Sequence, residues 1–205
     1  MKEIILASQS PRRRELLAQM GVEYEVIPSN FDEKLDDNRS PEEVACELAL
    51  GKAMAVAEQY PDRFVIGSDT IVTVNGKQLE KPHDAVEAHE ILKLLSGKPN
   101  DVCTGVAVVR VMDGVKLVGA DTTKVFFKSY NHEAISKYVA TGDSLDKAGA
   151  YGIQSGAAPL IDHIEGDYDT VIGLPTRLLT NLLAEVGVDA KSVELESPVP
   201  QVFKR

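Results

Sequence analysis

The chain has 205 residues, of which 43% are hydrophobic and 26% are charged. This composition is that of an ordinary globular protein, and it excludes a collagen, a coiled coil or disorder along the whole chain. The 22 Lys and Arg residues and the 32 Asp and Glu residues give a net charge of −10, which repels nucleic acid and anionic membranes at long range. We therefore expect no nucleic-acid partner and no membrane partner, and an anionic ligand must bind in a locally basic pocket.

The cysteines and the amino terminus suggest a cellular compartment. Cys46 and Cys103 form neither a Cys-x-x-Cys pair nor a disulfide framework, so we expect two reduced, buried thiols. The apolar run at residues 4–7 is too short for a signal peptide or a membrane span. A cytoplasmic location is the resulting expectation.

The first half of the chain predicts strands that alternate with helices. Short apolar or alternating runs indicate strands, Ser-Pro pairs at 10–11 and 40–41 indicate helix starts, and Asn75-Gly76 indicates a hairpin turn. These signals predict, in chain order, a strand at 4–6, a helix at 11–20, a strand at 22–26, a helix at 41–60, and paired strands at 64–74 and 77–80.

The second half predicts hairpins as well as helices. Asp84 caps a helix, Asp113-Gly114 separates two β-rich runs, and Leu174-Pro175 opens the last helix. The predicted elements are a helix at 85–96, strands at 102–112 and 115–127, a helix at 131–140, strands at 160–164 and 168–172, and a helix at 174–186. Because hairpins and interleaved helices occur together, we expect an α/β fold with a mixed twisted sheet, helices packed on it, and two lobes around a cleft.

The first candidate site lies where the first strand passes into the first helix, at residues 8–14 (Ser-Gln-Ser-Pro-Arg-Arg-Arg). The unpaired N–H groups and the dipole of a helix start favour an anion, and guanidinium groups bind phosphate oxygens in bidentate fashion. Three arginines at this end cost helix stability unless an anion offsets their charge. Ser8, Arg12 and Arg13 are therefore candidate phosphate ligands, and the alternative is a solvated basic patch.

Lys52 and Asp69 place opposite charges where the pattern predicts burial. Lys52 falls on the apolar stripe of the 41–60 helix, where its stem either snorkels to water or meets a buried anion. Asp69 lies in the buried run 64–74, where an ionised carboxylate needs a cation or a metal. Gly67 predicts a bulge or a close backbone approach that aims Asp69 into a cleft. The alternative for Asp69 is a structural carboxylate bonded to nearby backbone.

Two loop signals complete the candidate site. Lys81 ends the hairpin that returns alongside the strand of Asp69, so we expect the two residues to lie near each other; a solvated lysine is the alternative. Residues 146–154 (Asp-Lys-Ala-Gly-Ala-Tyr-Gly-Ile-Gln) place small residues before Gln154. Such a loop either approaches a ligand closely or makes a plain tight connection.

The chain carries a set of motifs at residues 7–13, 32–33, 51–53, 67–70, 80–82, 146–154 and 171–175. Together they resemble the motifs of the Maf family of nucleoside triphosphate pyrophosphatases. Ser68 and Ser155 depart from the family pattern, at positions where alanine and glycine are usual. The resemblance implies a single domain of the Maf/ITPase-like fold at residues 1–187, and it leaves residues 188–205 as an unassigned tail.

The resemblance implies that a nucleoside triphosphate is hydrolysed between its α and β phosphates, giving the monophosphate and pyrophosphate, with a divalent cation (Mg²⁺ or Mn²⁺). Asp69 would accept a proton from water, and Glu33 and Asp69 would hold the metal. The similar subgroup prefers dTTP and UTP, with CTP and modified pyrimidine nucleotides as further candidates, and serves nucleotide-pool housekeeping as a homodimer. The implied substrate-binding residues are Ser8, Arg12, Arg13, Lys52, Thr70, Lys81 and Gln154, of which Arg12, Thr70 and Gln154 are tied to the choice of base.

Two alternatives stay open at this point, one of another class and one with another substrate. One is a non-catalytic nucleotide-binding regulator of septum formation or cell division, and the other is a 7-methyl-GTP pyrophosphatase. Physical chemistry favours an enzyme over the regulator, because cations around a carboxylate offset the repulsion between a triphosphate and a base. A protein that only binds polyanions gains nothing from a carboxylate such as Asp69 that faces phosphates.

Overall fold

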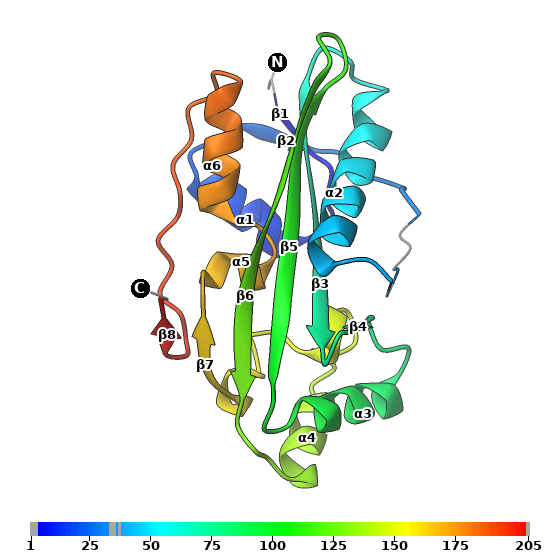
Figure 1. Cartoon of the computed structure of the whole chain (residues 1–205), viewed down its shortest axis with the longest axis vertical. Coiled ribbons are helices and arrows are strands. Elements are labelled where there is room, and N and C mark those ends of the chain that lie inside the picture. Colours follow the sequence, from blue (N-terminus) through cyan, green and yellow to red (C-terminus); the bar gives the residue numbers. More distant parts are fainter. Residues whose placement is uncertain (1–3, 33–35, 37, 204–205) are drawn as a thin grey trace.

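The computed structural model describes residues 4–32, 36 and 38–203 as one mixed α/β unit (Figure 1). Its sheet has the strand order β2-β1-β3-β5-β6-β7-β8, and β4 pairs with β3 off this path. The pairs β1–β2, β1–β3 and β7–β8 are parallel, whereas β3–β4, β3–β5, β5–β6 and β6–β7 are antiparallel. The expected mixed sheet is therefore confirmed. The strands are β1 (Ile4–Leu6), β2 (Tyr24–Val26), β3 (Phe64–Val74), β4 (Lys77–Leu79), β5 (Pro99–Arg110), β6 (Val115–Phe127), β7 (Ile161–Glu165) and β8 (Gln201–Val202).

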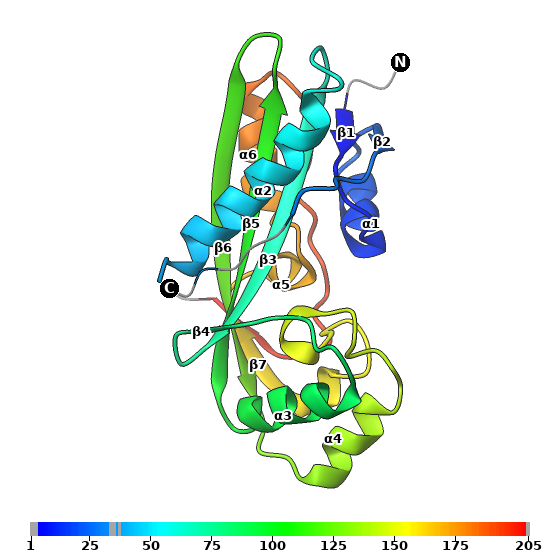
Figure 2. The ribbon, with the colours of Figure 1, turned by 90° about the vertical axis from the view of Figure 1, so that its right-hand side faces the viewer.

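The helices divide the molecule into two lobes. The long strands β3, β5 and β6 run through both lobes, with α2 on one face of the upper half of the sheet and α5 and α6 on the other (Figures 1 and 2). Below them, α3 and α4 cover the other end of the strands together with the short 3₁₀ segments η1 and η2 (Figure 2). The helices are α1 (Pro11–Gln19), α2 (Pro41–Ala57), α3 (Ala85–Leu95), α4 (His132–Val139), α5 (Tyr168–Ile172) and α6 (Thr176–Glu185), and the 3₁₀ segments are η1 (Ala148–Ala150) and η2 (Ala158–Leu160).

Helix α2 packs unusually close to the sheet. Its capping box at Ser40 and Glu43 fixes its start, and alanines at every fourth position face the strands. A Cβ atom at Gly67 would lie 2.1 Å from the carbonyl oxygen of Ala49, and one at Gly105 would lie 2.2 Å from that of Ala45. The close backbone approach predicted at Gly67 is therefore present.

One predicted strand is wrong. Residues 168–172 form the helix α5, which ends at Gly173 in the left-handed conformation (φ 114°). The carboxylate of Asp169 accepts hydrogen bonds from the backbone N–H groups of Thr170 and Thr176 and from the Thr176 hydroxyl, which fixes the α5–α6 corner. The edge of β7 that a returning strand would use is taken by β8, since Ile164 N–H donates to Pro200 and Gly166 N–H donates to Val202. Tertiary contacts thus override the β-branched composition of the segment.

The two cysteines and the lengths of the helices bear on the expected compartment. Cys46 and Cys103 are free, but only Cys103 is buried and Cys46 is half-buried. Burial raises the pKa of the Cys103 thiol to about 12, which keeps it protonated and unreactive. Within the described part of the chain, no helix has both the length and the apolar character needed to cross a bilayer.

Candidate functional site

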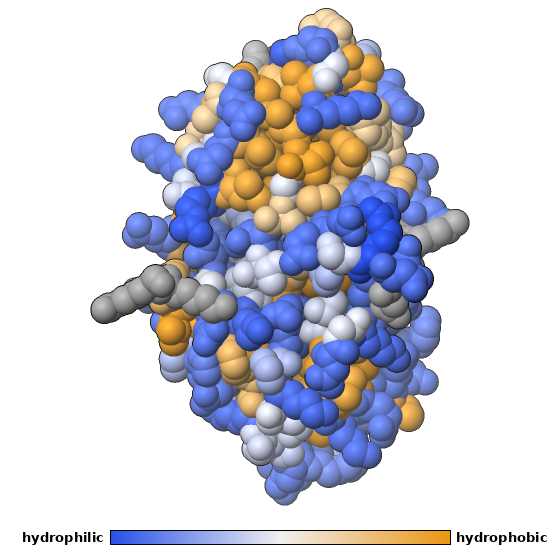
Figure 3. Space-filling model, in the orientation of Figure 1, coloured by the Kyte–Doolittle hydropathy of each residue, from blue (hydrophilic) through white to orange (hydrophobic). Residues whose placement is uncertain are grey.

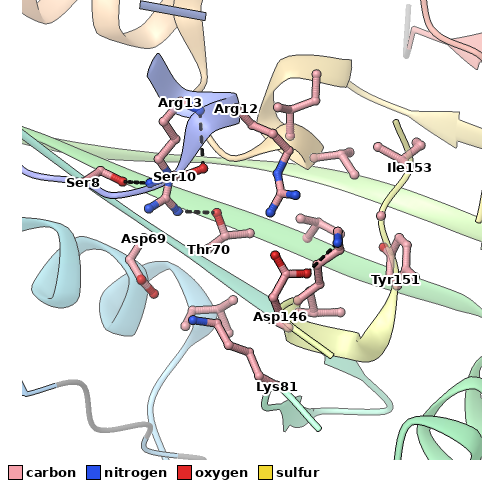
Figure 4. A pocket seen from close by; sticks show the side chains of 18 of the residues that line it. Ser8, Ser10, Arg12, Arg13, Asp69, Thr70, Lys81, Asp146, Tyr151 and Ile153 are labelled. Carbon is pink, nitrogen blue, oxygen red and sulfur yellow. Dashed lines mark hydrogen bonds and ion pairs between the residues drawn. The ribbon is translucent and has the colours of Figure 1, made fainter. Parts of the chain in front are cut away.

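The site lies at a gap in strand pairing along β3. On one edge β3 pairs continuously with β5, but on the other it pairs with β1 over residues 64–66 and with β4 over residues 72–74. Residues 67–71 therefore have no described strand on that second edge. A cavity of about 1030 Å³ opens there, and both lobes contribute to its wall (Figure 4). The cavity is lined by residues 7–13, 69–72, 79–83, 143, 146–148, 151–155 and 171–172, together with Ser29, Lys52 and Val102.

Lys52 and Asp69 form a buried ion pair at this cavity. The ammonium of Lys52, on α2, donates to Oδ1 of Asp69, on β3. Their side chains are only 11% and 9% exposed, so the pair is shielded from water. The approach of α2 that Gly67 permits brings the two charges together. The predicted inward direction of Lys52 is confirmed, and it meets a buried anion rather than snorkelling to water.

Arg13 fills part of the gap beside β3. Its Nη1 donates to the carbonyl oxygen of Ser68 at 2.8 Å, its Nε to that of Gly173 at 2.7 Å, and its Nη2 to the Thr70 hydroxyl at 3.1 Å. The Thr70 hydroxyl also bonds the Thr104 hydroxyl at 3.0 Å. Arg13 therefore supplies donors where a neighbouring strand is missing, and it joins α1 to β3 and to the α5–α6 corner.

Arg12 and Lys81 bring charges to the cavity that have no partner among the described residues. Arg12 points into the cavity from the first turn of α1, and Lys81 comes from the segment after β4 (Figure 4). Neither side chain has a hydrogen bond or ion pair with another residue of the described part of the chain. Because guanidinium and ammonium groups prefer anionic oxygens, these two are free to bind a ligand's phosphates.

The other predicted site residues are distributed as follows. Ser8 is buried, accepts a hydrogen bond from the Ser10 N–H at 3.2 Å, and lines the cavity. Thr70 and the exposed Gln154 line the same cavity. Glu33, the predicted second metal ligand, lies outside the described residues. Every other predicted site residue borders this one cavity, and it does so from segments far apart in the chain.

Sequence reasoning missed an ionic network on the opposite wall of the cavity. Lys147 is 9% exposed and donates to the Asp143 carboxylate at 2.8 Å, to the Asp143 carbonyl at 2.5 Å and to the Asp146 carboxylate at 2.6 Å. Burial opposes the charge of Asp143, but hydrogen bonds from Lys147, Ser155 and Tyr138 outweigh it and lower the pKa of the Asp143 carboxyl. Asp146 and Lys147 stand within the motif at 146–154, whereas nothing in the sequence pattern marks Asp143.

A buried carboxylate paired with a lysine, beside unpartnered cations in one large cavity, defines a site for a polyanionic ligand that undergoes proton transfer. The chain belongs to the family described as Maf-like protein, whose model matches residues 3–186. It is 44% identical to the dTTP/UTP pyrophosphatase of Dictyoglomus thermophilum over 187 residues, which cover 91% of this chain and 97% of the relative. It is 45% identical to the dTTP/UTP pyrophosphatases of Bacillus cereus (strain AH820) and Bacillus anthracis over 189 residues, which cover 92% of this chain and 98% of each relative. The family resemblance found in the sequence is confirmed.

Proposed function

We propose that this protein is a nucleoside triphosphate pyrophosphatase that hydrolyses dTTP and UTP to the monophosphate and pyrophosphate. CTP and modified pyrimidine nucleotides are further candidate substrates, and nucleotide-pool housekeeping is the role. The observation that carries the proposal is the buried Lys52–Asp69 pair in a cavity that Arg12 and Lys81 also line, each without a partner among the residues that the structure describes. The names of relatives that match nearly the whole chain support the same activity.

The chemistry divides between the carboxylate and the cations. Lys52 donates to Oδ1 of Asp69, and Oδ2 has no donor among the described residues, so Oδ2 accepts the proton of the attacking water. The water oxygen bonds to the α phosphorus, the bond between that phosphorus and the bridging oxygen breaks, and pyrophosphate leaves with the bridging oxygen. Arg12, Lys52 and Lys81 bind the phosphate oxygens and stabilise the charge that develops on the leaving group. The ordered hydrogen bonds of Arg13 hold the cavity wall against which the phosphates lie.

A divalent cation, Mg²⁺ or Mn²⁺, fits this donor set. Among the described residues no group of three His, Cys, Asp or Glu side chains gathers at one point. Mg²⁺ is commonly held by one or two carboxylates plus substrate phosphates. Asp69 borders the cavity and supplies one such carboxylate, and Glu33, which lies outside the described residues, is the proposed second ligand. When bound, the cation would neutralise phosphate charge and polarise a phosphoryl oxygen.

The choice of base rests on Arg12, Thr70 and Gln154. Thr70 is held in place by Arg13 and Thr104, so its position is set before a ligand binds. Gln154 offers both a donor and an acceptor, which suits the imide edge of thymine or uracil. We expect purine triphosphates to be poorer substrates.

The decisive test is a panel of triphosphates scored for pyrophosphate and for orthophosphate in the presence of Mg²⁺ or Mn²⁺. We expect pyrophosphate from dTTP and UTP. Asp69→Asn removes the proton acceptor but keeps an oxygen for Lys52, so it should lower kcat by about 100-fold or more at unchanged fold. An Asn variant as active as the unsubstituted protein would reassign the base. Turnover of 7-methyl-GTP alone would move the protein to that substrate, and binding without turnover would make it a regulator of cell division.

We also propose that two copies associate through the open edge of β6. Residues 124–127 pair with β7, but residues 115–123 have β5 on one edge and no described strand on the other. Val115, Leu117, Val118 and Ala120 are half-exposed there, and an apolar patch covers the surface over the upper part of β6, between α6 and α2 (Figure 3). An antiparallel strand edge is self-complementary about a two-fold axis, so a homodimer would cover the patch.

The dimer is tested by sedimentation with a charge placed on the edge. Val118→Lys puts an ammonium at the centre of the open strand and should convert the dimer to a monomer. Val86→Lys is the matched control, because Val86 is a 72% exposed apolar residue on α3 in the other lobe. A dimer that persists in Val118→Lys at low micromolar concentration would place the interface elsewhere.

A cytoplasmic location completes the proposal. Nucleoside triphosphates are consumed inside cells, and the free thiols Cys46 and Cys103 stay reduced in that compartment.

A further inference from the structure

The segment that presents Gln154 to the cavity is a tight turn. The N–H of Ser155 donates to the carbonyl oxygen of Gly152 at 3.2 Å, so Ile153 and Gln154 occupy the two central positions of a β-turn. Both central residues line the cavity, and Ile153 is buried whereas Gln154 is exposed. The orientation of this turn therefore decides where the Gln154 amide stands in the cavity.

Both ends of the turn are tied to one carboxylate oxygen. At the first end, the N–H of Gly152 donates to the Tyr138 hydroxyl at 3.0 Å, which in turn donates to Oδ2 of Asp143 at 2.6 Å. At the second end, the Ser155 hydroxyl donates to the same Oδ2. Asp143 is thus the point at which the two ends of the turn converge.

Lys147 holds that carboxylate from the other side. It bonds Oδ1 and the carbonyl oxygen of Asp143, and its stem lies directly under the turn. A Cβ atom at Gly152 would lie 2.6 Å from Cε of Lys147 and 2.6 Å from the hydroxyl oxygen of Ser155, so a larger residue there would have to displace these two side chains. The ammonium favours the ionised form of Asp143, in keeping with the lowered pKa of that carboxyl.

Tyr138 is suited to the relay between backbone and carboxylate. It is 4% exposed on α4, and burial, with the hydrogen bond to Asp143, raises the pKa of its hydroxyl far above its usual range. The hydroxyl therefore keeps its proton and donates to Asp143 while it accepts from Gly152. Through this residue the lower-lobe helix α4 fixes the turn.

We infer that Asp143 is a positioning residue for base selection: with Tyr138, Ser155 and Lys147 it sets the turn 152–155 so that Gln154 meets the nucleobase. This inference rests on the proposed function, because it assigns the base-reading role to Gln154. It adds a requirement that the proposed function alone does not make, namely that side chains which do not touch the substrate control the discrimination between pyrimidine and purine triphosphates.

The test compares Tyr138→Phe, Ser155→Ala and Asp143→Asn for KM and kcat with dTTP and dGTP. Each change removes or weakens one anchor of the turn, so we expect KM for dTTP to rise about threefold to tenfold while kcat stays within about twofold. The preference for dTTP over dGTP falls correspondingly. Ser136→Ala is the matched control, because the Ser136 hydroxyl lies on the same helix but bonds His89 and His132 instead of the turn.

The same substitutions made in the Gln154→Ala variant distinguish a positioning role from a general effect on the fold. In Gln154→Ala the amide that the turn presents is absent, so Tyr138→Phe and Ser155→Ala should cause no further rise in KM. An equal further loss in that background, or unchanged KM in the single variants of a base-selective protein, would overturn the inference and leave the proposed function standing. An unsubstituted protein that hydrolyses dGTP as well as dTTP would overturn the pyrimidine assignment itself, and the inference with it.

Discussion

Arg12 and Arg13 are adjacent in the first turn of α1 but have different surroundings. Arg13 donates hydrogen bonds to Ser68, Gly173 and Thr70. Arg12 points into the cavity and has no partner among the described residues (Figure 4). Hydrogen bonds to fixed carbonyl oxygens stabilise the folded chain, while an unpartnered guanidinium contributes to ligand binding. Substitution of Arg13 should therefore lower the stability of the fold, and substitution of Arg12 should lower the affinity for substrate.

We expect Arg13→Ala to destabilise the fold and Arg12→Ala to weaken substrate binding. Loss of the Arg13 hydrogen bonds leaves carbonyl oxygens in the gap beside β3 and should cost about 2 kcal/mol, or roughly 4–8 °C in Tm. Arg12→Ala should raise KM for dTTP about tenfold and leave Tm within about 1 °C. Thermal unfolding and steady-state kinetics on both variants measure the contrast, and equal Tm losses would show that the two arginines share one structural role.

At the scale of single residues, the sequence indicated which charged side chains belong to the site better than it indicated which side chains contact them. A charged residue in an apolar stripe or strand, such as Lys52 or Asp69, stands out because burial of an unpaired charge is costly. Asp143 does not stand out, since it lies in an exposed-looking polar segment with no periodicity. Its role depends on Tyr138 and Ser155, which reach it only in the folded chain. A network of side chains from separate loops does not produce a regular spacing of residues that could be recognised in the sequence.

At the scale of elements, the contact between α2 and the sheet positions the Lys52–Asp69 pair. The contact is set by Gly67 on β3 and Gly105 on β5, which lie opposite the backbone of α2. A methyl group at either position would overlap carbonyl oxygens of a rigid helix, which cannot move aside as a flexible side chain can. The helix would have to shift away from the strands and carry Lys52 with it.

We expect Gly67→Ala and Gly105→Ala each to lower the free energy of unfolding by about 3 kcal/mol and to reduce kcat. Gly119→Ala is the matched control, because a Cβ atom there meets the side chain of Leu178 at 3.2 Å, and that side chain can adjust. Denaturant unfolding and pyrophosphate release measure the two effects. Full activity in Gly67→Ala would mean that the helix position does not matter to the ion pair.

Prediction of the elements succeeded where periodicity or caps are strong and failed at α5. The signals of α2, such as its capping box and its apolar stripe, are local, and the hairpin turns are local as well. Residues 168–172 have only five positions, and their state depends on Asp169 and on β8, which arrives from the end of the chain. The bonds of Asp169 to Thr170 and Thr176 are local, but no window of sequence around the segment shows that β8 takes the edge of β7.

At the scale of the whole molecule, residues 188–203 run along the body of the protein from α6 to the edge of β7 (Figure 1). The N–H of Lys191 donates to Met20 at 3.1 Å and that of Val193 to the Thr176 hydroxyl at 3.0 Å. Further on, β8 pairs with β7, and Val199 is buried. The segment lies beyond the residues that the family model matches, yet it contacts both lobes, and we propose that it folds with them as one unit.

We expect truncation after Gly187 to destabilise the whole protein. The cut uncovers the edge of β7 and removes the apolar contacts of Val199 and of Val188, Val193 and Leu195 with the core, which together should cost about 4 kcal/mol, or roughly 8–16 °C in Tm. Truncation after Val202 is the control, because it keeps β8 and removes the 63% exposed Phe203. An exposed edge also pairs readily with other chains, so the shorter protein should aggregate at concentrations where the control remains dispersed. Equal Tm values for the two truncations would show that the segment only rests on the surface, and the single folding unit would then end near α6.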